Sequence, residues 1–178
     1  MVRIRPATLD DVPLIKTLIY EFAEFEKELD DVEITEEDLR RDGFGVEPKF
    51  RSLMLEWDGV IAGYAIFFNV FSTWEGRSAL FLEDLYVRPQ FRGKGIGKAV
   101  LKHLAGIAKR EGCFGMTWHV LDWNQPAIEF YRSIGARLME TRRIFLLSGE
   151  AFEEMAGVAR EKSKSFKPQR TQRSPRGI

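Results

Sequence analysis

A glycine-rich stretch in the middle of the chain, Arg92-Gly93-Lys94-Gly95-Ile96-Gly97-Lys98, constrains the fold more than any other segment. Residues 78–87, just before it, have the composition of a strand. The segment after it carries apolar side chains at helical spacing as far as Gly112. Residues 115–121 again resemble a strand. The order strand, glycine turn, helix, strand has the form of a parallel crossover.

The remaining segments predict further strands and helices around this crossover. Strands are expected at 2–5, 52–57, 60–71 and 142–147, and Asp58-Gly59 between two of them is a hairpin signal. Helices are expected from residues 8–11 to about 27, from Thr35 onward, and from 124–126 to Gly135, with a loop at 42–48. This order predicts an α/β chain of the mixed α+β kind, with a mixed sheet covered by helices on both faces.

Length and charge suggest one domain with a tail. The chain has 178 residues, and its single cysteine, Cys113, rules out an internal disulfide. Its net charge is zero, so electrostatics give no reason to expect a nucleic-acid partner. Residues 160–178 hold seven basic residues and one acid, which leaves residues 1–159 with a net charge of −6. We expect 1–159 to form the domain and 160–178 to be a basic, disordered tail.

Nothing in the sequence predicts a membrane or a metal. No apolar run follows Arg3 and Arg5, so no signal peptide is expected, and the longest apolar stretch, 60–70, is too short to span a bilayer. We therefore expect a cytoplasmic protein with no membrane partner. His103 and His119 lack the spacing of metal ligands, so no metal cofactor is expected.

The glycine turn suits a pyrophosphate group. Glycines let backbone N–H groups approach a ligand closely, and the helix that follows adds the positive end of its dipole. Two familiar motifs do not fit. A P-loop needs Gly and Ser or Thr where this chain has Arg92 and Ala99, and a dinucleotide fingerprint needs Gly in place of Val100. A glycine turn without any ligand is the plain alternative.

A second block downstream gives the turn a context. Asn124-Gln125-Pro126-Ala127 opens a helix that carries Phe130-Tyr131 and ends near Gly135-Ala136. Together with the glycine turn, this block resembles the GNAT superfamily of acetyl-CoA-dependent N-acetyltransferases. Further blocks resemble its diamine (spermidine/spermine) acetyltransferase branch: Arg5-Pro6-Ala7-Thr8, residues 34–39, Asp42-Gly43-Phe44-Gly45, Leu82-Glu83-Asp84 and Trp123-Asn124. The resemblance extends from about residue 2 to residue 157.

The resemblance implies the acyl-CoA N-acyltransferase fold, with a central mixed, mostly antiparallel twisted sheet and helices on both faces. It also implies acetyl-CoA as co-substrate, a small cationic amine (a polyamine, a diamine or a lysine analogue) as acceptor, and a homodimer. The acetyl group would move by direct attack of the amine in a ternary complex.

The resemblance also implies residue roles. Tyr131 would protonate the departing thiolate, and Glu83 would line the amine site and help to remove the proton of the amine. The acceptor would also contact Phe25, Glu26 and Glu140. Contacts with the cofactor are implied for Leu85, Tyr86, Val87, Arg92, Gly93, Lys94, Gly95, Ile96, Gly97, Lys98, Asn124, Pro126 and Ala127.

Elementary chemistry explains why such groups are needed. An alkylamine has a pKa of roughly 10, so at neutral pH it is mostly an ammonium without a lone pair, and a carboxylate can take its proton. A carboxylate on an apolar strand face is costly without a partner, which favours a site at Glu83. Alternation along the strand predicts that Asp84 points to the opposite face. Tyr131 could also be a plain core residue.

Two features leave the acceptor open. Ten acids and one base lie between Glu21 and Asp38, either as a solvated helix face or as a rim that attracts a polycation. Ser72 and Thr73 stand where the polyamine enzymes carry an acid, and Arg142 replaces an aromatic residue, so the amine site is less acidic than theirs. Acetylation of a protein lysine or N-terminus, and binding of acetyl-CoA without turnover, are the other two functions considered.

Overall fold

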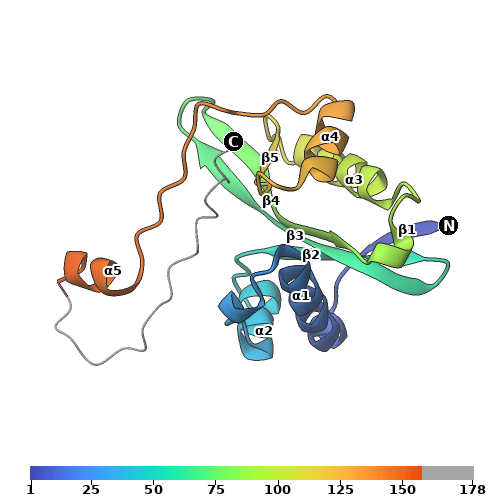
Figure 1. Ribbon diagram of the computed structural model, residues 1–178, viewed down its shortest axis with the longest axis horizontal. Helices are drawn as coiled ribbons and strands as arrows, with labels where there is room; N and C mark the ends of the chain where they lie inside the picture. Colours follow the sequence, from blue (N-terminus) through green and yellow to red (C-terminus); the bar gives the residue numbers. More distant parts are fainter. Residues whose placement is uncertain (158–178) are drawn as a thin grey trace, which may run out of the picture. The chain divides into compact units, whose positions relative to one another are not determined.

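A computed structural model describes residues 1–157 of the chain (Figure 1). By their contacts the residues fall into two compact units, Met1–Asn124 and a second unit that begins at Gln125, and each is described separately. The predicted basic tail, 160–178, lies outside the described residues. Within residues 1–157 no helix has both the length and the apolar character needed to cross a membrane.

The first unit is built on one five-stranded sheet. Its strands are β1 (Val2–Pro6), β2 (Arg51–Trp57), β3 (Val60–Ser72), β4 (Arg77–Val87) and β5 (Met116–Trp118), in the spatial order β1-β2-β3-β4-β5. The first four are antiparallel neighbours, whereas β5 runs parallel to β4. The predicted mixed, mostly antiparallel sheet is therefore confirmed, with the crossover where the glycine turn placed it.

Helices cover both faces of this sheet. Helices α1 (Val12–Glu26) and α2 (Glu36–Phe44) lie on one face and α3 (Ile96–Arg110) lies on the other (Figure 1). Three short 3₁₀ turns, η1 (Leu9–Asp11), η2 (Leu29–Asp31) and η3 (Pro89–Phe91), lie between these elements. Under α1 and α2 a buried core brings together side chains from both helices and three strands: Val12, Ile15, Leu18, Leu39, Met54, Tyr64, Ile66 and Tyr86.

Local signals in the sequence fix two of the element boundaries. Asp58 and Gly59 have φ values of 49° and 81°, as a two-residue hairpin turn between β2 and β3 requires. Helix α2 begins at a capping box, in which the Asp38 amide donates to Thr35 Oγ1 (3.1 Å) and the Thr35 amide donates to Asp38 Oδ2 (3.0 Å). The hairpin and the start of α2 therefore lie where the sequence predicted them, whereas α2 continues to Phe44, into the loop predicted at 42–48.

The second unit holds α4 (Gln125–Ser133) and α5 (Gly149–Met155), and the rest of residues 125–157 is irregular. The strand predicted at 142–147 is wrong, and α5 was not predicted. The side chains of Ile144, Phe145 and Leu146 are 72%, 95% and 69% exposed. A β-strand needs a neighbouring strand for its backbone hydrogen bonds, and the described part of this unit contains none.

Candidate active site

The glycine turn leaves the start of α3 open. Gly93 (φ 74°) and Gly95 (φ 78°) both adopt the left-handed backbone that other residues rarely tolerate. Gly95 is the N-cap of α3, and within residues 1–157 no side chain caps this helix end. The first N–H groups of a helix have no hydrogen-bond partner within the helix. The space beside the turn is open, because a Cβ added at either glycine would meet no heavy atom within 4 Å. Open space and available amides fit the predicted pyrophosphate.

Strand β4 loses its neighbour on one side just before the predicted cofactor residues. It pairs with β5 only at Leu80–Met116, Phe81–Thr117 and Leu82–Trp118. Residues 84–87 continue to pair with β3 on the other side. Within the described chain, the edge of residues 83–87 that faces away from β3 therefore has no strand partner. An extended ligand can bind such an edge through backbone hydrogen bonds.

Two of the predicted cofactor residues can contact a ligand only through their backbone. The side chains of Tyr86 and Ile96 are buried, with 5% and 2% of their surface exposed. Tyr86 packs under α1, where its ring centre lies 5.7 Å from that of Phe22. Lys94 on the turn and Lys98 in the first turn of α3, by contrast, are exposed. These positions agree with a cofactor held by backbone amides and surface cations.

The side chain of Arg92 connects the glycine turn to the end of α1. Its Nε donates to the Val87 carbonyl (2.8 Å), and the guanidinium carbon lies 4.3 Å from the centre of the Phe25 ring. The same Phe25 ring lies 5.9 Å from that of Trp123. A guanidinium over an aromatic face is an attractive contact. A residue predicted to bind the cofactor and a residue predicted to bind the amine are therefore in direct contact.

Glu83 occupies a β-bulge. Ile66 of β3 pairs with Asp84 and Phe67 pairs with Leu82, so Glu83 has no partner on β3. A bulge interrupts the alternation of side chains and re-aims them, and here Glu83 and Asp84 line the same cavity. The prediction that Asp84 points to the opposite face is therefore wrong, because it assumed regular pairing.

The carboxylates near this bulge interact with one another. Tyr64, which is fully buried, donates its hydroxyl proton to Asp84 Oδ2 (2.9 Å). Burial raises the pKa of Asp84 to about 6, and the charge of Glu83 adds to this while the Tyr64 hydrogen bond opposes it. Burial also raises the pKa of Glu26 to about 7, helped by the charges of Glu28 and Asp84. Carboxylates that disfavour one another's ionisation favour a cation between them.

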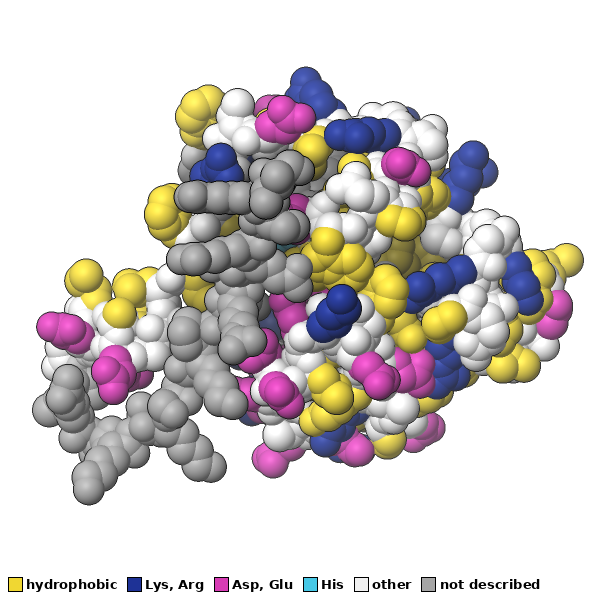
Figure 2. Space-filling view, in the orientation of Figure 1, with side chains coloured by type: hydrophobic (Ala, Val, Ile, Leu, Met, Phe, Trp, Pro, Cys, Tyr) yellow, Lys and Arg dark blue, Asp and Glu magenta, His cyan; other side chains and the backbone are white. Residues whose placement is uncertain are grey.

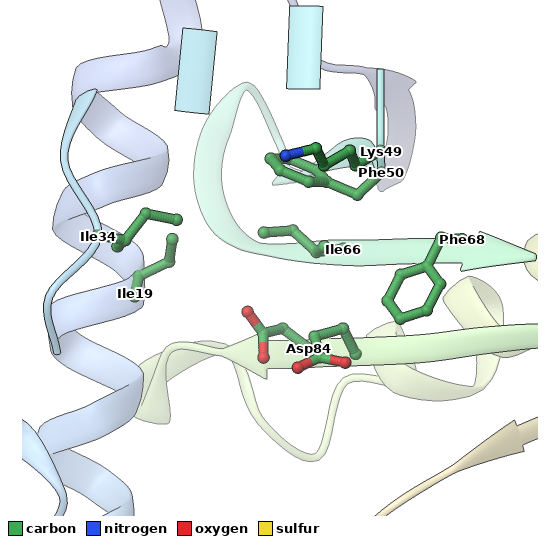
Figure 3. Close-up of a pocket in the computed structure, with 8 residues that line it drawn as sticks. Ile19, Ile34, Lys49, Phe50, Ile66, Phe68 and Asp84 are labelled. Atoms are coloured by element: carbon green, nitrogen blue, oxygen red, sulfur yellow. The ribbon is translucent and has the colours of Figure 1, made fainter. Parts of the chain in front are cut away.

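A cavity of about 460 Å³ opens beside these groups (Figure 3). Ile19 of α1, Ile34 before α2 and Phe68 of β3 form much of its apolar wall, and Glu83 and Asp84 supply carboxylates. Glu26 does not line the cavity but lies close enough for its charge to interact with that of Asp84, so Glu83, Asp84 and Glu26 lie in one region. A mostly apolar cavity with a few charged groups is the usual form of a small-molecule site.

The end of α1 is held against the end of β4 by an ion pair that the sequence analysis missed. Arg88 donates from Nε to Glu21 Oε2 (2.9 Å) and from NH2 to Glu21 Oε1 (2.6 Å). The Arg88 hydrogen bonds hold the pKa of Glu21 below its usual value. The two residues are 67 positions apart, and nothing in their spacing could reveal the pair. This contact fixes the part of α1 that carries Phe25 and Glu26.

The acidic segment 21–38 is partly neutralised. Figure 2 shows acidic side chains gathered where α1 and α2 lie, with basic side chains among them. Besides Glu21, Glu36 pairs with Arg40 and Asp38 pairs with Arg41. Glu24, Glu33 and Glu37 are exposed. The segment therefore combines the solvated helix face of one interpretation with the acidic surface of the other.

Four predicted site residues lie in the second unit. Tyr131 is half-buried on α4, and its ring lies 5.4 Å from that of Phe130. Pro126 and Ala127 are in the first turn of α4, and Glu140 is exposed in the irregular segment that follows. Their roles, like that of Asn124 at the end of the first unit, stay predictions.

Comparison with known proteins identifies the family. Residues 15–136 match the acetyltransferase (GNAT) family. A thialysine N-epsilon-acetyltransferase from Sus scrofa is 41% identical over 167 residues, which cover 88% of this chain and 98% of the relative. A spermidine/spermine N(1)-acetyltransferase-like protein from Homo sapiens is 40% identical over 141 residues, or 75% of this chain and 20% of that protein.

The fold gives the same result. An integron cassette protein from the mobile metagenome of V. cholerae has a solved structure that superposes with a TM-score of 0.70 at 26% identity, covering 87% of this chain and 97% of that one. The family match spans well over half of the chain, and the pig relative aligns over nearly its whole length. We conclude that this chain belongs to the acetyltransferase (GNAT) family and is an acetyl-CoA-dependent N-acetyltransferase.

Proposed function

We propose that the protein transfers the acetyl group of acetyl-CoA to the primary amine of a small cationic molecule by direct attack in a ternary complex. The observation that carries the proposal is the cavity at the β4 bulge, where Glu83 and Asp84 face an apolar wall. A thialysine acetyltransferase and a spermidine/spermine acetyltransferase-like protein are relatives at about 40% identity, which supports an acceptor of this class.

Acetyl-CoA would bind on the side of the sheet where β4 has no neighbour. The pyrophosphate would accept hydrogen bonds from the amides at 93–98, and the pantetheine arm would lie along residues 85–87. The open space at Gly93 and Gly95 and the unpaired edge of β4 support this placement. The thioester supplies the activated acetyl group, and the backbone amides next to it would stabilise the charge that develops on its oxygen.

Glu83 would act as the base for the amine. Because the bulge points its carboxylate into the cavity, Glu83 can accept the proton of the ammonium directly or through a water molecule. Asp84 and Glu26 would hold the cation in place, and bound cation would in turn favour their ionised forms. Tyr131 would return a proton to the sulfur as the thiolate leaves.

A decisive experiment is to incubate the protein with acetyl-CoA and a panel of amines and to follow free thiol. We expect thiol release with small cationic amines such as lysine, ornithine, cadaverine and putrescine. A preference for a protein lysine or N-terminus would favour the second function, and binding of acetyl-CoA without thiol release for any acceptor would favour the third.

Tyr131→Phe separates catalysis from binding. The hydroxyl is needed only as the thiolate leaves, so we expect kcat to fall by about 10²-fold or more while the affinity for acetyl-CoA changes little. An unchanged kcat, with chemistry shown to be rate-limiting, would remove Tyr131 from the mechanism. Phe130→Leu, at the neighbouring aromatic residue, is the control for altered packing of α4.

We also propose a homodimer, as in the diamine branch that the sequence resembles, since a closed twofold pair is the commonest assembly. Sedimentation at micromolar concentration should give twice the chain mass of 20.6 kDa, and a single-chain mass would contradict the proposal.

A further inference from the structure

The cavity at the β4 bulge carries opposite charges. Lys49 lines the same cavity as Glu83 and Asp84. In Figure 3, Lys49 lies beside Phe50 on one side of the cavity and Asp84 lies on the other, with Ile66 between them. A molecule that fills this cavity therefore meets an ammonium at one end, an apolar wall in the middle and carboxylates at the other end.

The ammonium of Lys49 is held at the mouth of the cavity. Its Nζ lies 2.9 Å from Asp42 Oδ1, while 71% of the side chain is exposed to solvent. The backbone N–H of Lys49 donates to the Asp42 carbonyl (2.6 Å), which closes the loop from α2 to β2. An ammonium has three N–H donors, and the contact with Asp42 uses one of them. The others can bind a carboxylate from the ligand.

Charge decides which small amine fits this arrangement. A diamine that places one ammonium at Glu83 brings its second ammonium toward Lys49, and these two cations repel, although the Asp42 carboxylate beside Lys49 offsets part of the repulsion. An amino acid with a primary amine in its side chain brings an α-ammonium there as well, but the α-carboxylate on the same carbon balances that charge and can accept hydrogen bonds from the Lys49 ammonium. Its side-chain methylenes match the apolar middle of the cavity.

We propose that Lys49 is a specificity-determining residue that binds the α-carboxylate of the acceptor, so that the protein acetylates the side-chain amine of a small amino acid in preference to a diamine. The inference rests on the proposed function, because it assigns the other end of the acceptor to Glu83. It also assigns the two ends of the cavity different tasks: Glu83 takes part in the reaction, whereas Lys49 selects the substrate.

Two pairs of substrates isolate the carboxylate. Lysine and cadaverine differ only by this group, as do ornithine and putrescine. Initial rates of thiol release are measured for the full chain at saturating acetyl-CoA, for the natural protein, Lys49→Met and Lys49→Glu. Methionine keeps an unbranched apolar stem without the charge. Lys109→Met, at an exposed lysine in the last turn of α3, is the control for removing a surface cation.

We expect Lys49→Met to raise KM for lysine and ornithine by about five- to twentyfold, as for loss of one charge-assisted hydrogen bond near the surface. KM for cadaverine and putrescine should stay the same or fall, and kcat should change little. Lys49→Glu should raise KM for lysine and ornithine further and lower KM for cadaverine and putrescine, so that the variant prefers the diamines. Lys109→Met should leave all four values unchanged.

Asp42→Asn tests whether the effect comes from the ammonium or from the loop. This substitution removes the ion pair of Lys49 with Asp42 but keeps the ammonium, so KM for lysine should stay the same or fall. The proposal is overturned if Asp42→Asn raises KM for lysine as much as Lys49→Met does, or if Lys49→Met changes lysine and cadaverine equally or not at all. If none of the four amines releases thiol in the natural protein, the proposed function itself fails.

Discussion

For Glu26 and Asp84, the surroundings favour the neutral carboxylic acid, whereas binding a cationic acceptor requires the carboxylate. Their surroundings disfavour negative charge, and the pKa values rise to about 7 for Glu26 and to about 6 for Asp84. A cationic acceptor needs both groups ionised. The two carboxylates therefore remain partly protonated near neutral pH until a cation binds, so the affinity for the acceptor depends on pH.

The first prediction concerns this titration. Cadaverine stays a dication between pH 5.5 and 8, so a change in its affinity over this range does not come from titration of the acceptor. We expect its dissociation constant, measured by calorimetry in the presence of CoA, to rise as the pH falls through 7 and 6. Glu26→Gln should weaken binding at pH 8 and flatten the profile. A dissociation constant that does not change with pH would contradict the assignment.

The raised pKa of Glu26 changes stability in the opposite direction from acceptor binding: raising the pH strengthens binding of the acceptor but lowers the free energy of unfolding. Since the pKa of Glu26 is raised from 4.5, its neutral form is favoured by folding, and that contribution is complete below pH 4.5 and is lost as pH rises through about 7. The free energy of unfolding without ligand should therefore fall over this range, and less so in Glu26→Gln.

The second prediction concerns Gly95. Valine is strongly disfavoured at φ 78°, and its side chain would occupy the open space in front of α3. We expect Gly95→Val to weaken the binding of acetyl-CoA at least tenfold by calorimetry, because it blocks the amides. Gly112→Val, at φ 73° after the other end of α3, imposes similar strain and is the control. Equal affinities in two folded variants would show that the turn is not the site.

Single residues show what the sequence could and could not predict. Glu83 and Glu26 could be chosen because a motif and a resemblance pointed to them, and the structure places both in one region. The position of Asp84 at the cavity could not be predicted, because the bulge that reorients its side chain arises from the pairing of β3 with β4. The contact of Arg92 with Phe25 could not be predicted either, because it depends on how α1 lies across the sheet.

Among the elements, those with strong local signals were predicted well. Strand β4, the glycine turn, α3 and the hairpin at Asp58-Gly59 agree with the structure to within a few residues. Residues 142–147 are apolar enough for a strand but form none in the structure. The composition of this segment favours a strand, but a strand forms only when it can pair with a neighbouring strand. Whether such a neighbour is present depends on the tertiary structure, which the local sequence does not reveal.

The third prediction concerns how β1 is joined to the start of α1. Arg5 on β1 donates two hydrogen bonds to Asp11, at 2.7 and 2.8 Å, and these hold the pKa of Asp11 at about 2, below its ordinary 3.8. Because the folded pKa is lowered, this stabilisation is present above pH 3.8 and is lost as the pH falls through about 2. Asp11 is buried, so the contribution at pH 7 is on the order of 2 kcal/mol.

Asp11→Asn should therefore lower the free energy of unfolding by about this amount at pH 7 and reduce its dependence on pH between 4 and 2. Asp10→Asn, at the exposed neighbour, is the control and should change little. Urea unfolding at several pH values measures both. Equal stabilities for the two variants at pH 7 would mean that the contacts of Asp11 with Arg5 stabilise nothing.

At the scale of the whole molecule, the distribution of charge bears on how the acceptor arrives. Residues 1–159 carry a net charge of −6, and acidic side chains are concentrated around α1 and α2. Such a field raises the local concentration of cations and speeds their encounter with the protein. The pairs of Glu36 with Arg40 and of Asp38 with Arg41 weaken the field but leave Glu24, Glu33 and Glu37 exposed.

The last prediction follows from screening. Salt limits electrostatic attraction to roughly 8–10 Å at physiological ionic strength, so added salt removes the long-range part of this field. KM should therefore rise with salt for every cationic acceptor, and more for the dication cadaverine than for lysine, whose net charge is +1. The measurement belongs at pH 8, where Glu26 is ionised. Glu37→Gln should reduce the slope for cadaverine, while Asp10→Asn, outside the acidic segment, should not. An equal dependence of KM on salt concentration for cadaverine and lysine would show that the acidic surface does not attract the acceptor electrostatically.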